Sequence, residues 1–272
     1  MRILCRVLSV SVGGFYAWVK RPLCMRERED GELTKHITSI YHQHQGRYGS
    51  PRIHVQLRDE GIGVGYKRVV RLMKQTGLAA RHRTHRVVTT RADPNATPAD
   101  NVLDRDFEAE EPDQKWVCDV TYIGTAVGWL YLAAVLDLSS RRVVGWAMAA
   151  KQDEALVHQA LVMAVTHRRP QAGLLHHSDR GCQYTSQAYQ SYLQELDIRV
   201  SMSRKGNCWD NAVMERFFGT LKRECTAQMY FATHQDARTA LFEYIEAYYN
   251  RVRKHSTLGY LSPVQFELAT TH

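Results

Sequence analysis

Hydrophobic and polar residues alternate in short runs through the second half of the chain, which is the spacing of β-strands. Three runs, joined by short Gly or Ser-Arg turns, cover about residues 116–123, 129–137 and 141–149. Such short connections predict an antiparallel meander. Two more strand-like runs and two helical patterns follow it at 174–179, 198–203, 153–168 and 186–196. This order predicts an α/β fold with a mixed five-stranded sheet flanked by helices.

Helical spacing dominates the first 75 residues. Residues 1–22 read as two short helices around a Ser/Gly turn, and 29–46 read as a longer helix. Two further helices, up to about Glu60 and from Gly65 to Gln75, are joined by a Gly-containing turn, as in a helix-turn-helix. The second is basic, and a basic run follows it, so we expect DNA contacts from Lys67, Arg68, Arg71, Lys74, Arg81, Arg83 and Arg86.

The net charge of +8 is unevenly placed along the chain. Residues 1–91 hold 18 Lys and Arg against 6 Asp and Glu, whereas residues 92–114 hold 1 against 8. Residues 115–272 are closer to neutral, with 17 against 14. This pattern predicts a nucleic-acid-binding module joined by an acidic linker to an enzyme-like body. A solvated basic face is the alternative.

Cysteine spacing and hydropathy exclude several other classes of protein. The six cysteines include no C-x-x-C pair, which argues against a disulfide framework and against a zinc finger. No apolar run approaches the roughly 18 residues of a membrane span. We therefore expect a soluble cytoplasmic protein that has no membrane partner.

Three carboxylates are placed where strands or helices would deliver them to one site. Asp119 lies within a strand, Asp179 ends the fourth strand, and Glu215 lies on a helix expected from about Asp210. Such carboxylates suit Mg²⁺, or Mn²⁺ in its place, and two ions could activate an attacking oxygen and stabilise a leaving one at phosphorus. Asp137 is a rival for which a turn or ion-pair role is preferred.

Five motifs resemble OrfB-type transposases of bacterial insertion sequences, a copy-and-paste class within the retroviral-integrase superfamily. They are RYGSPRI, WVCDVTYI, HHSDRGCQYTS, SRKGNCWDNAVMERFFGTLKRE and YYNRVRKHSTLGYLSPVQF. The resemblance implies a ribonuclease-H-like sheet preceded by a small all-α helix-turn-helix region. It also implies a DDE triad of Asp119, Asp179 and Glu215 and a contact from Lys222 to the end of the element's DNA. We expect Trp209 and Asn211 to shape the same pocket.

The resemblance further implies DNA cleavage and strand transfer at insertion-sequence ends, with the upstream reading-frame product as a fusion or partner and a homo-oligomer on DNA. It would act in the bacterial cytoplasm, at the nucleoid when bound to DNA. A DNA-binding regulator with an inactive integrase-like scaffold, or a structure-directed nuclease, are the alternatives. The predicted domains are 1–28 helical, 29–91 helix-turn-helix-like, 92–114 acidic linker, 115–232 catalytic core and 233–272 C-terminal helical extension.

Several charged residues receive other predictions. Glu224 is expected to be solvated, and Asp210 to lie early in a helix where the dipole stabilises it. A structural or supporting role is expected for one of His176 and His177. The basic turn near the C-terminus could grip DNA or form a solvated loop, and its residues are Arg251, Arg253, Lys254 and His255.

Overall fold

The computed structural model describes residues 1–81, 99–204 and 208–270 of the chain. It forms two compact units, Met1–Arg81 and His82–His272. No described helix has the length and apolar character needed to cross a bilayer.

The first unit is all-α. Its helices are α1 (Arg2–Val7), α2 (Val12–Val19), α3 (Met25–Gln43), α4 (Ser50–Asp59) and α5 (Tyr66–Gln75). A proline in the first turn starts α4, where its missing N–H costs nothing. The helices α3, α4 and α5 contact one another around a buried core that includes Ile37, Ile53, Leu57 and Val69. The expected pair of helices around a glycine turn is therefore present as α4 and α5.

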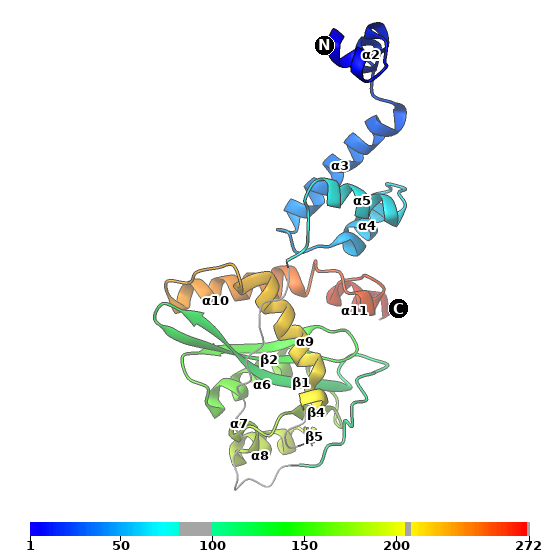
Figure 1. The fold of residues 1–272 in the computed structure, drawn as a ribbon. Helices are drawn as coiled ribbons and strands as arrows, with labels where there is room; N and C mark the ends of the chain where they lie inside the picture. The colour runs from blue at the N-terminus through cyan, green and yellow to red at the C-terminus, as the bar shows by residue number, and fades with distance from the viewer. Residues whose placement is uncertain (82–98, 205–207, 271–272) are drawn as a thin grey trace. The chain divides into compact units, whose positions relative to one another are not determined.

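The second unit is built on a five-stranded sheet with the order β3-β2-β1-β4-β5 (Figure 1). Its strands are β1 (Lys115–Thr125), β2 (Gly128–Asp137), β3 (Val143–Ala149), β4 (Leu175–Ser178) and β5 (Arg199–Met202). The pairs β1–β2 and β2–β3 are antiparallel, whereas β4 is parallel to both β1 and β5. The predicted meander and mixed sheet are confirmed.

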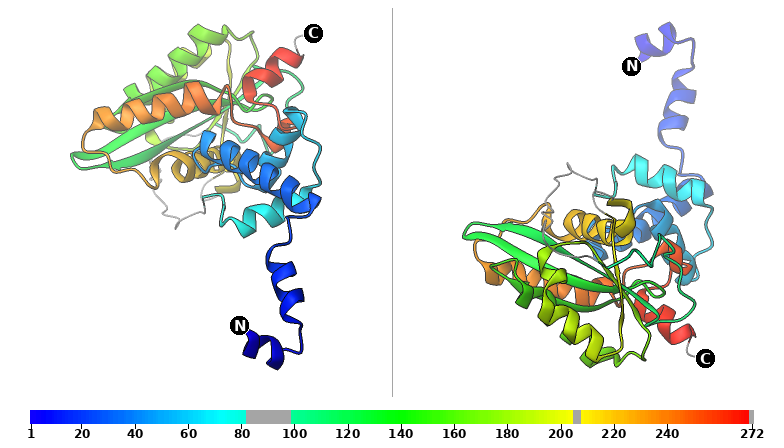
Figure 2. Two further views of the ribbon diagram at one scale, coloured as in Figure 1. Left: turned by 90° about the horizontal axis from the view of Figure 1, so that it is seen from above. Right: turned by 90° about the horizontal axis from the view of Figure 1, so that it is seen from below.

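Helices cover both faces of this sheet (Figures 1 and 2). One face packs on α6 (Glu154–Arg168), α7 (Cys182–Thr185) and α8 (Gln187–Glu195). The other packs on α9 (Ala212–Leu221), on α10 (His234–Phe242) and on the π-helical turns η2 (Lys222–Thr226) and η3 (Glu243–Tyr249). Strand alternation puts even-numbered residues of β1, such as Trp116 and Cys118, in the first core, and Val117 and Ile123 in the second.

Strand β3 and helix α6 approach each other unusually closely at Gly145. A Cβ atom at this position would lie 2.2 Å from the carbonyl oxygen of Ala160 and 2.7 Å from the Cβ of Ala164. Only a residue without a side chain fits here, which fixes how α6 lies on the edge of the sheet.

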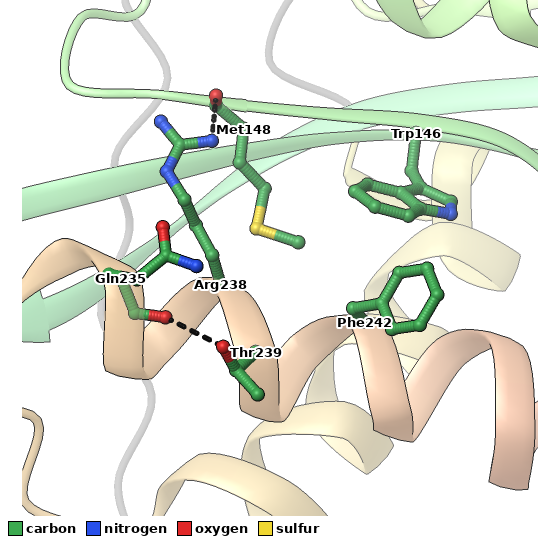
Figure 3. Close-up of a pocket in the computed structure, with 6 residues that line it drawn as sticks. All are labelled: Trp146, Met148, Gln235, Arg238, Thr239 and Phe242. Carbon is green, nitrogen blue, oxygen red and sulfur yellow. Dashed lines mark hydrogen bonds between the residues drawn. The ribbon is translucent and has the colours of Figure 1, made fainter.

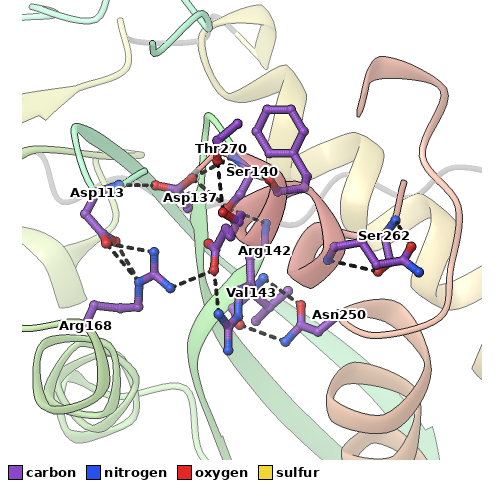
Figure 4. Close-up of polar contacts among 12 residues, drawn as sticks. Asp113, Asp137, Ser140, Arg142, Val143, Arg168, Asn250, Ser262 and Thr270 are labelled. Carbon is purple, nitrogen blue, oxygen red and sulfur yellow. Dashed lines mark hydrogen bonds and ion pairs between the residues drawn. The ribbon is translucent and has the colours of Figure 1, made fainter. Parts of the chain in front are cut away.

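Asp113, just before β1, ties its segment to the rest of the second unit. Asp113 pairs with Arg168 of α6 at 2.7 Å, and Arg168 also pairs with Glu267 of α11 (Pro263–Thr270). Asp137 accepts hydrogen bonds from the Ser140 backbone and hydroxyl and from the Asp113 N–H (Figure 4). The turn role predicted for Asp137 is thereby confirmed, and the C-terminal helix is tied to the end of the sheet.

Candidate active site

Sheet register brings Asp119 and Asp179 together. The parallel pair β1–β4 aligns Trp116 with His176 and Val117 with His177, an offset of 60 residues. Continuing this offset by two residues places Asp179, directly after β4, beside Asp119 in the middle of β1. The spacing of the two acids in the sequence is therefore the spacing that parallel pairing needs.

The electrostatics of Asp119 record the surrounding charges. Burial raises the pKa of Asp119 well above its usual range, and the negative charges of Asp179 and Glu215 raise it further. The Val120 N–H, which donates to its Oδ1 at 2.8 Å, and the charge of Lys222 act in the opposite direction. Three acids and one lysine therefore lie within electrostatic reach of one another.

Asp179 is held by its own loop. Burial raises the pKa of Asp179, while the Gly181 N–H, which donates to Oδ1 at 2.9 Å, lowers it. A Cβ at position 181 would lie 3.0 Å from that same Oδ1. A glycine here therefore lets the backbone amide approach the carboxylate closely.

Glu215 and Lys222 are presented by different kinds of helix. Glu215 is exposed in the first turn of α9, whereas Lys222 is half-buried where α9 passes into the π-helical turn η2. The Lys222 Nζ lies 4.5 Å from the centre of the Tyr122 ring. Burial lowers the pKa of Lys222, and the nearby Asp119 partly offsets this. Tyr122 was not singled out from the sequence; its position three residues after Asp119 on an open part of β1 is the signal that could have found it.

Asn211 supports the site from below. It lies in the 3₁₀ turn η1 (Cys208–Asn211) and is buried, and its Nδ2 donates to the carbonyl oxygen of Cys118 at 3.0 Å. This bond ties the start of α9 to the backbone immediately before Asp119. Within the described ranges its Oδ1 has no hydrogen-bond partner. The Trp209 side chain lies outside what the structure describes.

The donor chemistry of the site fits a hard divalent cation. Its acids offer only carboxylate oxygens, and a cation would relieve the repulsion that raises the pKa of Asp119. Among residues 1–81, 99–204 and 208–270, no three His, Cys, Asp or Glu side chains gather closely enough to hold a metal. Closing three carboxylates around an ion would require Glu215 to swing inward, which its exposed position permits.

The two histidines before Asp179 have structural partners. His176 is fully buried, and its Nε2 lies 3.0 Å from both the Cys118 Sγ and the Tyr189 hydroxyl. His177 contacts the hydroxyls of Ser201 and Ser203. Burial lowers the pKa of His176 to about 3 and that of His177 to about 4, so both are neutral at physiological pH. The structural role expected for one of them holds for both.

Two predictions about charged residues in this part of the chain are wrong. Glu224 is buried instead of solvated, because it accepts two hydrogen bonds of 2.8 Å from Arg253 and one of 3.0 Å from Tyr244. Arg253 and His255 are likewise buried, so they form neither a solvated loop nor a DNA grip. Asp210 lies in the first turn of the 3₁₀ helix η1, directly before α9, so its predicted position early in a helix holds; it is fully buried and accepts hydrogen bonds from Arg105 and the Arg204 N–H.

The basic helix α5 divides its cations between two environments. Arg68 and Arg71 each bond to Asp30 of α3 at 2.7 Å, and Arg68 also bonds to Glu29. Lys67 and Lys74 are exposed, and Arg81 is partly buried at the end of the first unit. Arg83 and Arg86 lie outside the described residues.

A separate pocket of about 370 Å³ lies between β3 and α10 (Figure 3). It is lined by Trp146, Met148, Gln235, Arg238, Thr239 and Phe242. Arg238 donates to the Met148 carbonyl oxygen at 2.7 Å. None of these lining residues is a carboxylate, and β3 is the edge strand farthest from β4, so the pocket is not part of the site described above.

Known proteins match both units. An HTH-like domain model matches residues 27–86, and two integrase core domain models match residues 109–208 and 196–263. The transposase InsF of insertion sequence IS3A from Escherichia coli is 40% identical over 273 residues, covering 98% of this chain and 93% of that protein. The chain belongs to the same family of insertion-sequence transposases as InsF.

Other comparisons agree with this membership. A 31 kDa protein of insertion element IS600 from Shigella sonnei is 40% identical, covering 97% of both chains. The transposase of element IS904 from Lactococcus lactis is 42% identical, covering 86% of this chain and 93% of its own. The simian T-cell lymphotropic virus intasome shares the fold, with a TM-score of 0.50 at 16% identity over 81% of this chain and 70% of that one. The transposase is thus a DDE-type polynucleotidyl transferase with a ribonuclease-H-like core, and it acts in DNA transposition and integration.

Proposed function

We propose that Asp119, Asp179 and Glu215 are the acids at which the transposase cuts and joins DNA. The observation that carries this proposal is the convergence of their charges, with that of Lys222, at the middle of β1. Each acid comes from a different element, and Asp119 and Asp179 lie on the adjacent parallel strands β1 and β4 or directly after them.

Two Mg²⁺ ions held by these carboxylates, or Mn²⁺ in their place, would supply charge neutralisation at the scissile phosphate and activation of the attacking oxygen. The chain's own groups position the DNA. Lys222 offers a cation beside Asp119 for a phosphate near the cut, and Asn211 fixes the start of α9. Trp209 would complete the wall of the pocket.

The reaction takes place in two displacements at phosphorus. Water first attacks the phosphodiester at the end of the element, breaking its P–O3′ bond and leaving a free 3′-hydroxyl. That hydroxyl then attacks a second phosphodiester, forming a new P–O3′ bond as the old one breaks. No covalent bond to the protein is needed, and the first joining would yield a circular DNA that is later inserted into a target.

The first unit would recognise the element ends. We assign phosphate and groove contacts to the exposed Lys67 and Lys74 and to Arg68 and Arg71, whose ion pairs to Asp30 and Glu29 would compete with DNA. The basic run Arg81, Arg83 and Arg86 would extend these contacts. The proposed domains are then an N-terminal helical segment (1–28), this recognition part (29–91), an acidic linker (92–114), the catalytic core (115–232) and a C-terminal helical extension (233–272).

Partners and location follow from the same chemistry. Joining two DNA ends in one reaction favours a homo-oligomer on DNA, and the upstream reading-frame product would add a further DNA-binding part. Because the substrate is bacterial DNA, we expect action in the cytoplasm, at the nucleoid.

The test is cleavage and joining of labelled DNA carrying the end of the encoding element, with Mg²⁺ or Mn²⁺. Glu215→Gln should bind this DNA as the wild type does and fail to cut it. Glu195→Gln is the matched control, because Glu195 is an exposed carboxylate at the end of α8, on the face of the sheet opposite α9. If Glu215→Gln cuts as fast as the wild type, the triad is wrong. If wild type and variants all bind without cutting, even with the upstream product, a DNA-binding regulator explains the chain better.

A further inference from the structure

An exposed aromatic surface lies beside Lys222, at the tip of the β1–β2 hairpin. Trp129 is 54% exposed, and its ring lies edge-on to Tyr122, with ring centres 4.8 Å apart. Trp129 also lies across from Gly124 in the strand register, with a ring carbon 3.4 Å from the position of a Cβ there. We call Tyr122 and Trp129 the hairpin platform.

Further apolar side chains surround the hairpin platform. Val127 in the hairpin turn is 62% exposed, and Tyr230, in the loop before α10, is 82% exposed. That loop is joined to the hairpin by the Ala126 N–H, which donates to the Phe231 carbonyl oxygen at 2.9 Å. Large apolar groups concentrated on one exposed tip indicate a binding surface more than a packing defect.

The position of the hairpin platform indicates what it binds. Lys222 lies over the Tyr122 ring and is influenced by the charge of Asp119, so it links the hairpin platform to the acids. A cation beside flat aromatic rings is the combination by which proteins hold single-stranded nucleic acid, with the cation on phosphate and the rings on bases. A base inside a duplex has both faces covered, so an open ring suits an unpaired base.

We propose that the hairpin platform stacks an unpaired base of the DNA strand whose phosphate lies at the triad. The proposal rests on the function proposed above. At about 3.3 Å per residue, Tyr122 lies about 10 Å and Gly124 about 17 Å along β1 from Asp119. At about 3.4 Å per stacked nucleotide, the stacked base lies within about five nucleotides of the scissile phosphate.

The stacking interaction would help to separate the strands at the cut. Unpairing a base costs a few kcal/mol, and stacking on an aromatic side chain offsets about 1–3 kcal/mol of that, or about 5- to 150-fold in an equilibrium. Asp119 and Asp179 are only partly exposed, and burial raises the pKa of both. A strand released from its complement can approach them more closely than a duplex can.

The first test is photocrosslinking of the full-length protein, without metal, to duplex DNA spanning the junction of the encoding element and its flank. 5-Iododeoxyuridine replaces one base at a time within five nucleotides on either side of the cut. Crosslinks from one or two positions should map to Trp129 or Tyr122. Crosslinks that map only elsewhere, or a platform covered by a second copy of the chain in the DNA complex, would overturn the proposal.

The second test uses substitutions at Trp129. Trp129→Leu keeps an apolar cover over Gly124 and should slow cleavage of fully paired DNA by about 5- to 150-fold, whereas Trp129→Phe should stay near the wild-type rate. DNA with mismatched bases beside the cut should restore Trp129→Leu towards the wild type. An equal loss on paired and mismatched DNA would show that Trp129 is only structural. Crosslinking needs no chemistry at the triad, so it can succeed even where Glu215→Gln refutes the proposed function.

Discussion

The buried pair of Glu224 and Arg253 offers a quantitative test of the structure. Arg253→Met would remove the guanidinium and keep an apolar stem of similar length. The side chains of Arg253 and Glu224 are only 5% and 3% exposed, and the Arg253 guanidinium donates two hydrogen bonds of 2.8 Å to the Glu224 carboxylate. Burial alone lowers the pKa of Arg253, yet the bonds to Glu224 raise it overall, so Arg253 stays charged in the folded protein.

The expected cost follows from leaving Glu224 buried without its cation. Breaking one partner of a buried pair costs about 3–5 kcal/mol. A unit of this size shifts its Tm by about 2–4 °C per kcal/mol, so Arg253→Met should melt roughly 6–20 °C lower. Glu224→Gln combined with Arg253→Met should recover part of the loss, because no charge is then left buried.

The assay is thermal unfolding followed by circular dichroism, in low salt and without DNA. Arg251→Met is the matched control, because Arg251 is the same residue type two positions earlier and is exposed. Its Tm should stay close to that of the wild type. If Arg251→Met and Arg253→Met melt together near the wild type while only Arg253→Met loses DNA affinity, the buried pair is wrong and a DNA contact is right.

Three further changes test other parts of the second unit. Asp119→Asn should abolish cleavage yet raise the Tm at pH 8 without metal. The pKa of Asp119 is higher in the folded than in the unfolded chain, so the wild type loses stability as pH rises, and Asn removes that loss. A lower Tm for Asp119→Asn would contradict this reasoning. The folded His176 has a pKa of about 3 and stays neutral at pH 5, whereas the unfolded imidazole takes up a proton between pH 7 and pH 5. The free energy of unfolding should therefore fall by about 2 kcal/mol over this range because of His176. His176→Gln should flatten the dependence of urea unfolding on pH, and an unchanged slope would exclude His176 as its source. Gly145→Ala should destabilise the protein by about 1–3 kcal/mol or more, because the backbone atoms of α6 cannot move away from a new Cβ. Gly219→Ala is the control, because the space around Gly219 is open and no such loss is expected. Equal Tm values for the two variants would refute the close approach at Gly145.

Periodicity in the sequence predicts most of this fold for a physical reason. Each strand of the meander has its own alternating pattern and a short turn, so local information determines both the element and its neighbour. The placement of Asp119 on a strand and of Asp179 at the end of one needs no more than such local patterns. Predicting that these two acids lie side by side needs more, because the parallel contact of β1 with β4 joins residues 60 apart, and no local pattern indicates which strands will be adjacent.

The failures at α9 have a different cause. The sequence predicts a helix from about Asp210, but the chain passes from a 3₁₀ turn through α9 into a π-helical turn. Glu224 looks like a surface residue because its partner Arg253 lies 29 positions later. Charge alone does not distinguish a solvated acid from one that is buried with a distant guanidinium.

The two π-helical turns make the arrangement of their side chains depend on the exact number of residues in each turn. Each accommodates one residue more than an α-helical turn would, and one residue corresponds to about 100° of helix rotation. In η2 the Ala227 N–H donates to the Lys222 carbonyl oxygen, five residues back, and Glu224 then faces Tyr244 of η3. Removing one residue from η2 would let it relax to a regular α-helical turn and would change which of its residues face Tyr244. Lys222 and the Glu224–Arg253 pair are therefore set by the number of residues in this segment as much as by their identities.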